Sequence, residues 1–217
     1  MFLCEIDNEI TLRLLQTKHT DELHSLVKNN LDHLGQWIPW VAYGTSKEQI
    51  ESYMRSVEEQ LKHNSAVHVG IWYTCDKAGY DDDLVGVVST SRIDWANKTL
   101  SLGYWIEQNA ESLSLVSRPV RFLIEFAFNE LNMNRIEIRC APENLASRRI
   151  PERLHFTQEG VLREAEQLNG RFVDHVLYSL LASDHHAREE IRERMCFECL
   201  ATEPSGHVRD DIEYDCD

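Results

Sequence analysis

The stretch that decides the fold is residues 134–160, NRIEIRCAPENLASRRIPERLHFTQEG. Its first part, residues 135–140, alternates charged and apolar side chains, which predicts a strand with one buried face. Asn144 then provides an N-cap for a helix that runs to Leu154, and Pro151 predicts that this helix is short or bent. A strand followed by a polar loop and a short helix exposes backbone groups at a strand end, where α/β folds bind ligands.

Outward from this stretch, the sequence predicts further strands and amphipathic helices. Alternation of apolar and polar residues predicts strands at residues 10–15, 67–74, 84–94, 99–106, 161–165 and 172–182. Apolar residues at helical spacing predict helices at residues 20–30, 46–63 and 120–131. Ser46 and Gln49 form a capping box at the start of the second helix. Together these elements predict an α/β fold.

The composition limits the class of protein. With 217 residues, of which 42% are hydrophobic, the chain can bury the core of one domain. A formal net charge of -15 argues against nucleic acid as the main partner, because phosphate contacts need clustered lysine and arginine. No apolar run approaches the roughly 20 residues that span a bilayer. We therefore expect no membrane partner and a cytoplasmic location.

Residues 184–217 differ in composition from the rest of the chain. Eleven acidic residues stand against four basic ones there, a balance of -7. We therefore expect one domain at residues 1–183, followed by a charged helix to about residue 200 and a disordered acidic tail. Cys196 and Cys199 lack two further ligands at a standard spacing, so we expect no metal site there. The six cysteines are scattered, which argues against a disulfide framework.

The C-terminal half of the sequence resembles a known family. Three features carry the resemblance: the Asn-x-x-Ser motif of Asn144 and Ser147, the run from Glu152 to Phe156, and the ending LNGRFVDHVLYSLL at residues 168–181. They are similar to the RimJ/RimL-type N-acetyltransferases of the GNAT superfamily, and the similarity extends over about residues 10–182. The resemblance implies a mixed, mostly antiparallel, seven-stranded sheet. That sheet is splayed between its fourth and fifth strands and carries helices on both faces.

The resemblance also implies an activity. Proteins of this family transfer an acetyl group from acetyl-CoA directly to an amine, with neither a metal nor a covalent intermediate. It implies a protein α-amine as the acceptor, with the N-terminus of a ribosomal protein as one candidate. A free α-amine has a pKa of about 7.7–8.0, so only mild general-base help is needed. The sequence leaves a homodimer open.

The same resemblance assigns roles to particular residues. Glu166 matches the general base, and Ser147 matches the acid that protonates the departing thiolate. Asn144 and the backbone of Trp105 and Ile106 match groups that bind the pantetheine arm. Without the resemblance, Glu166 is also typical of an exposed loop carboxylate, and Ser147 is typical of a residue in a first helical turn.

The loop expected to bind the CoA diphosphate departs from the family pattern. The family has Gln-Gly-x-Gly, whereas this chain has ESLS at residues 111–114. Glycine lets the backbone approach phosphate and adopt positive φ, and Glu111 adds negative charge. We therefore expect CoA binding that is weaker than in the family but not lost. The residues expected to contact the cofactor in this region are Ser112, Ser114, Ser117 and Arg118, the last as a compensating charge.

Two other functions stay open on the sequence. A degenerate acetyltransferase would keep the fold and act as a binding or regulatory module. The altered loop favours this reading, and the intact residues 140–181 oppose it. A small-molecule acetyltransferase, acting on a polyamine or an antibiotic, is favoured by the acidic surface. Residues 34–43, which include Trp37 and Trp40, either pack on the core or form a wall of the acceptor pocket.

Overall fold

The computed structural model describes residues 3–42, 45–111 and 114–188. The chain divides into two compact units, residues 1–182 and 183–217, and the sheet belongs to the first. In the second unit, residues 183–188 are helical. The rest of the expected charged helix, Cys196, Cys199 and the acidic tail lie outside the described residues. Within the described ranges, no helix is both long and apolar enough to cross a membrane.

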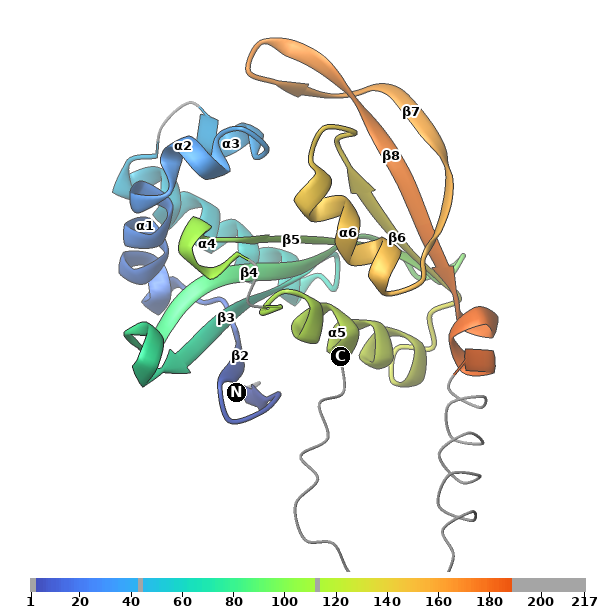
Figure 1. Ribbon diagram of the computed structural model, residues 1–217, viewed down its shortest axis with the longest axis horizontal. Helices are drawn as coiled ribbons and strands as arrows, with labels where there is room; N and C mark the ends of the chain where they lie inside the picture. The colour runs from blue at the N-terminus through green and yellow to red at the C-terminus, as the bar shows by residue number, and fades with distance from the viewer. Residues whose placement is uncertain (1–2, 43–44, 112–113, 189–217) are drawn as a thin grey trace, which may run out of the picture. The chain divides into compact units, whose positions relative to one another are not determined.

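An eight-stranded sheet forms the centre of the first unit (Figure 1). Its order is β1-β2-β3-β4-β5-β6-β8-β7, and only β5 and β6 are parallel neighbours. The strands are β1 (Leu3–Glu5), β2 (Ile10–Leu14), β3 (Val67–Cys75), β4 (Tyr80–Asp94), β5 (Thr99–Ile106), β6 (Arg135–Cys140), β7 (Thr157–Leu168) and β8 (Arg171–Leu181). The seven expected strands are present, so the predicted count was one too low. The additional strand is β1, which is too short to show alternation.

Helices cover both faces of the sheet, as expected. They are α1 (Thr20–Asn29), α2 (Leu31–Leu34), α3 (Pro39–Ala42), α4 (Lys47–Lys62), α5 (Ser117–Asn129) and α6 (Leu145–Arg153), with 3-10 turns at Thr17–His19, Asp76–Ala78 and Gln108–Ala110. Residues of α5 and α6 pack on one face with Ile136 and Ile138. Residues of α1 to α4 pack on the other face around Trp72. The capping box of α4 is confirmed, because Ser46 Oγ accepts a hydrogen bond from Gln49 N and Gln49 Oε1 accepts one from Ser46 N.

The sheet splays between β5 and β6. These parallel strands pair only over Thr99–Leu102 and Arg135–Ile138, and their register ends there. The edge of β5 that faces β6 is therefore open from Gly103 to Ile106. On its other edge, β5 lies very close to Gly86 of β4. A Cβ added at Gly86 would meet Trp105 O at 2.5 Å, so a glycine is needed to hold this part of β5 in place.

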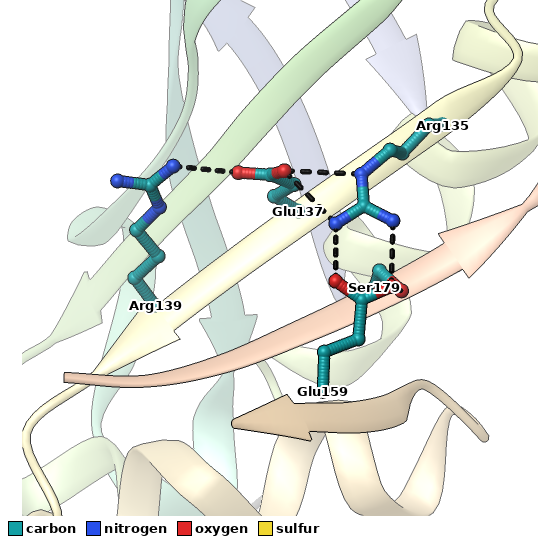
Figure 2. A network of polar contacts seen from close by, with 5 residues as sticks. All are labelled: Arg135, Glu137, Arg139, Glu159 and Ser179. Carbon is teal, nitrogen blue, oxygen red and sulfur yellow. Dashed lines mark hydrogen bonds and ion pairs between the residues drawn. The ribbon is translucent and has the colours of Figure 1, made fainter. Parts of the chain in front are cut away.

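A network of charged side chains ties β6, β7 and β8 together (Figure 2). Arg135 donates two hydrogen bonds to Glu159, at 2.7 and 2.5 Å, and Ser179 Oγ donates a third to the same carboxylate at 2.7 Å. Glu137 accepts from Arg135 Nε at 3.0 Å and from Arg139 Nη2 at 2.8 Å. The network holds the C-terminal half of the sheet together next to the splay.

The pKa of Glu159 makes this network sensitive to acid. Its hydrogen bonds from Arg135, and then from Ser179, lower the pKa of Glu159 to about 2. Because the folded-state pKa is depressed, the stabilisation is present above the ordinary glutamate pKa of about 4.3 and is lost as the pH falls toward 2. We expect Glu159→Gln to lower the free energy of unfolding at pH 7 by roughly 1 kcal/mol, since the carboxylate is partly exposed and screened.

Urea unfolding of both proteins at several pH values measures this effect. The difference between wild type and Glu159→Gln should shrink below about pH 4.3. Glu125→Gln is a suitable control, because no hydrogen bond or ion pair to the Glu125 side chain is found in the described part of the chain. A difference that is constant with pH, or equal in the control, would contradict this role for Glu159.

Candidate active site

A cavity of about 1110 Å³ lies at the splay and is lined from both faces of the sheet. On the face of α5 and α6 it is lined by Tyr104, Cys140 and residues of α6, together with the loop before α5. On the opposite face it is lined by Trp105, Arg139, His175 and residues near α2. The expected site residues that line it are Trp105, Ile106, Ser114, Ser117, Asn144, Ser147 and Glu166. The splay thus connects the two faces of the sheet through one cavity.

The start of α6 forms one wall of the cavity. Asn144 is its N-cap, as predicted, and Asn144 Oδ1 accepts a hydrogen bond from Ser147 N at 3.0 Å. Tyr104 Oη donates to the carbonyl oxygen of Ser147 at 2.8 Å, which fixes this turn against β5. The Ser147 hydroxyl has no hydrogen-bond partner among the described residues, so it is available to a ligand. Pro151 lies inside α6, as expected.

Cys140 lies beside this wall as a buried thiol. It is the last residue of β6, and its Sγ is 4.0 Å from Tyr104 Oη. Burial raises the pKa of Cys140 to about 11, so the thiol is protonated at neutral pH. Cys140 is therefore a strand residue and not an activated nucleophile, which agrees with its place in the alternating pattern of residues 135–140.

In the serine loop, residues 111–114, Ser114 has a backbone conformation that glycine usually provides. Ser114 has a φ of 55°, in the left-handed region that residues other than glycine seldom adopt. Ser117 is the first residue of α5 and is buried. The start of a helix leaves backbone amides free for an anion. Ser112, the other expected contact in this loop, lies outside the described residues.

The cations beside the serine loop come from α6. Arg153 donates hydrogen bonds to Ser114 Oγ, at 3.5 Å, and to Ser117 Oγ. Arg149 lies one turn earlier on the same helix and also lines the cavity. Its side chain has no partner within the described residues. The two arginines place positive charge at the end of the cavity where α5 begins.

Two charged residues expected to act on a diphosphate are directed elsewhere. Arg118 is not among the lining residues, and its guanidinium pairs with Asp7 at 2.6 Å and with Glu9 at 3.1 Å. The structure therefore does not bring Arg118 to the site. Glu111 lines the cavity, but its Oε1 lies 3.4 Å from His33 Nε2 on α2. Its carboxylate thus has a partner on the α2 side of the cavity.

Glu166 lines the cavity next to a β-bulge. Between the pairs Leu162–His175 and Glu166–Val173, β7 advances four residues while β8 advances two. The extra residues include Glu164, which has a φ of 49° and whose N donates to Asp174 Oδ1 at 2.8 Å. Glu166 Oε2 lies 3.3 Å from His175 Nε2. Glu166 is thus a strand residue with a specific partner rather than a free loop carboxylate.

The aromatic stretch before α4 both lines the cavity and packs on the core. Trp37 and Ile38 line the cavity. Trp40 stacks on Tyr53 of α4, with ring centroids 5.1 Å apart. The wall of the cavity formed by α2 and the residues after it is therefore apolar and is supported from behind by a packed aromatic pair.

Four residues that line the cavity were not predicted from the sequence: His33, Arg149, Arg153 and His175. A signal was present for the arginines, because Arg149 and Arg153 are spaced four apart in a helix that starts with a cap. No local pattern marked His33 or His175, since each meets its glutamate through the tertiary fold.

The backbone at Ser114 leads to a stability prediction. A residue with a Cβ costs roughly 1–2 kcal/mol in the left-handed region compared with glycine. We expect Ser114→Gly to raise the free energy of unfolding by about 1 kcal/mol, because its 3.5 Å hydrogen bond is too long to offset the relief. Ser117→Gly is the matched control and should destabilise, since it places glycine in a helix and removes a buried hydroxyl. Equal destabilisation by both changes would show that Ser114 is not strained.

This chain is similar to known acetyltransferases in both sequence and fold. The family model described as "Acetyltransferase (GNAT) domain" matches residues 9–157. The chain is 34% identical to "Putative ribosomal N-acetyltransferase YdaF" of Bacillus subtilis, over 83% of this chain and 96% of that protein. The solved structure of RimL, a ribosomal L7/L12 alpha-N-protein acetyltransferase in complex with coenzyme A, has a TM-score of 0.77 and 26% identity, and the match covers 84% of this chain and 99% of that one.

A second solved acetyltransferase structure is also similar to this chain. The microcin C7 self immunity acetyltransferase MccE, in complex with acetyl-CoA and AMP, has a TM-score of 0.73 and 29% identity, and the match covers 81% of this chain and 94% of that one. The family model covers more than half of the chain, and the matched residues include the paired parts of β5 and β6 at the splay and the whole of the capped α6. The chain belongs to the acetyltransferase (GNAT) family of N-acetyltransferases.

Proposed function

We propose that this protein transfers the acetyl group of acetyl-CoA directly to the N-terminal α-amine of a protein. One observation carries the proposal: the cavity runs through the sheet splay, with a carboxylate on one face and a helix start with arginines on the other. A ribosomal protein is the favoured acceptor class, because relatives carry that acceptor in their names.

The residues at the α5 end of the cavity fit the diphosphate of CoA. At the start of α5, Ser117 N is bonded to Ser114 O and Pro119 has no N–H, so the amides of Val116 and Arg118 would donate to an anion, and Arg153 and Arg149 would supply positive charge. The open edge of β5 at Trp105 and Ile106 would hold the pantetheine arm through backbone hydrogen bonds. The positive charge of Arg149 and Arg153 would compensate for the missing glycines. The compensating charge would therefore come from α6 rather than from Arg118.

The residues around the splay fit the chemistry of acyl transfer. When bound, acetyl-CoA supplies a thioester whose carbonyl carbon is open to attack by an amine. Glu166 would accept the proton of the α-ammonium, which needs only a mild base because its pKa is about 7.7–8.0. The unpartnered Ser147 hydroxyl would give a proton to the sulfur. Tyr104 and Asn144 would hold Ser147 in place through its backbone.

A small amine is the second candidate acceptor. The acceptor end of the cavity contains two carboxylates, Glu111 and Glu166, each beside a histidine. This arrangement also suits a substrate with two positive charges, such as a polyamine. The apolar wall of Leu34, Trp37 and Ile38 favours the peptide, because a polyamine has no bulky side chain to fill it.

An acceptor panel tests the proposal. The wild-type protein is incubated with acetyl-labelled acetyl-CoA and either peptides with free N-termini, the same peptides with blocked N-termini, or spermidine. Label on free peptides alone supports the proposed acceptor. Label on spermidine alone would move the function to small amines. CoA binding without transfer to any acceptor would favour a binding module.

A further inference from the structure

We propose that His175 is the positioning residue of the general base. Its Nε2, 3.3 Å from one carboxylate oxygen of Glu166, holds that side of the carboxylate and leaves the other oxygen directed at the amine. The inference rests on the proposed function, because it takes Glu166 as the group that accepts the proton.

The geometry of β7 and β8 brings the two side chains together. The bulge places Glu166 opposite Val173, and His175 lies two residues further along β8, so all three side chains point to the same face of the sheet. This is the face that also carries Arg139 and Trp105, opposite the face of α5 and α6. Glu166 Oε2 is 3.3 Å from His175 Nε2, and both side chains line the cavity. The bulge therefore turns the carboxylate toward the histidine and the cavity together.

The two partners differ in how firmly they are held. The Glu166 side chain is 36% exposed and has three rotatable bonds, so on its own it would sample many positions. The His175 side chain is only 15% exposed and extends from the middle of β8. Glu166 is its single hydrogen-bond or ion-pair partner among the described residues. A half-buried ring on a paired strand thus gives a more exposed carboxylate a fixed point, which a general base needs.

The proton balance leaves His175 unchanged. The α-ammonium gives one proton to the free oxygen of Glu166. The amine nitrogen then forms the C–N bond, and the C–S bond breaks with its electron pair on sulfur. Sulfur gains a proton from the Ser147 hydroxyl, and the second proton of the amine replaces the proton that Ser147 has lost. Glu166 then returns its proton to water, so the reaction releases one proton in total. His175 keeps its Nε2 proton throughout, so it acts through Glu166 and not on the substrate.

The cavity provides an internal comparison. His33 and Glu111 form a second histidine–glutamate pair, at 3.4 Å, on the side of α2. The two pairs have the same chemistry and similar exposure, but only one contains the proposed base. The same substitution at His33 and at His175 therefore separates a positioning effect from a general effect of losing a histidine at the cavity.

Steady-state kinetics on four single and two double variants test the role. We expect His175→Phe, which keeps a ring but removes the donor, to lower kcat about tenfold or more without changing the KM for acetyl-CoA or the Tm. His175→Gln, which restores an N–H donor, should recover most of the loss. In a Glu166→Gln background, His175→Phe should cause no further loss, because the carboxylate that it positions is gone. His33→Phe should instead combine additively with Glu166→Gln.

Several results would overturn the positioning role of His175. Full activity in His175→Phe, additive losses with Glu166→Gln, or no recovery by His175→Gln would overturn the positioning role. A loss that follows a fall in Tm in both His175 variants would assign His175 to stability and overturn it as well. Wild-type protein that transfers acetyl to no amine would overturn the proposed function and this inference together, which distinguishes that failure from the others.

Discussion

Replacing Glu166 with glutamine is expected to lower kcat/KM for acetyl transfer about 100-fold, the usual size of a lost general base. Glutamine keeps the size of the side chain but cannot accept the proton of the α-ammonium. The carboxylate lies on the face of the sheet opposite the serine loop, so the affinity for CoA should hardly change. Initial rates at varied acceptor concentration, together with the Kd for CoA, measure both quantities.

A matched control for this change is Glu164→Gln. Glu164 lies in the same bulge but does not line the cavity, and its contact with Asp174 is made by its backbone N. Loss of activity in Glu164→Gln equal to that in Glu166→Gln would point to disturbance of the bulge. Unaltered turnover in Glu166→Gln would remove Glu166 from the mechanism.

Replacing Arg153 with alanine is expected to weaken CoA binding about 30-fold, or roughly 2 kcal/mol, the size of a hydrogen bond to a charged group. Arg153 lies beside Ser114 and Ser117 at the start of α5 and lines the cavity. In the proposed site, its positive charge would take the place of the close backbone approach that glycines allow. The Kd for CoA, measured by calorimetry at fixed ionic strength, tests this, and the loss should shrink as salt is added.

The variant Arg118→Ala tests which arginine binds the diphosphate of CoA. The sequence suggested Arg118, whereas in the structure Arg153 lines the cavity. The guanidinium of Arg118 is bound to Asp7 and Glu9 and lies outside the cavity. We expect its removal to leave the Kd for CoA within error of wild type. If Arg118→Ala weakens binding as much as Arg153→Ala does, the assignment of diphosphate binding to α6 is wrong.

Local sequence patterns were sufficient to predict much of the fold and one wall of the site. The alternation at residues 135–140, the cap at Asn144 and the proline within α6 each act over a few residues, so each can be read without the tertiary structure. The family resemblance added the splay, and it placed Glu166 and Ser147 at the cavity, where their roles stay predictions. The positive φ of Ser114 agrees with the glycine that the family has in this loop.

The part of the site that was not predicted from the sequence depends on contacts between segments that are distant in the chain. Arg153 reaches Ser117 across 36 positions of sequence, and no local rule predicts that contact. The direction of Arg118 depends on where the turn before β2 places Asp7 and Glu9. The pairing of Glu166 with His175 depends on a bulge that adds residues to β7 alone. In each case the sequence shows the residue but does not show which distant residue it contacts.

Calorimetric titration of the wild-type protein with CoA tests the central claim most directly, because the account requires that the serine loop and the arginines of α6 still form a cofactor site. The result we predict is saturable binding of one CoA per chain, with a Kd that rises in Arg153→Ala and hardly changes in Glu166→Gln. Absence of binding by a folded wild-type protein would contradict the account.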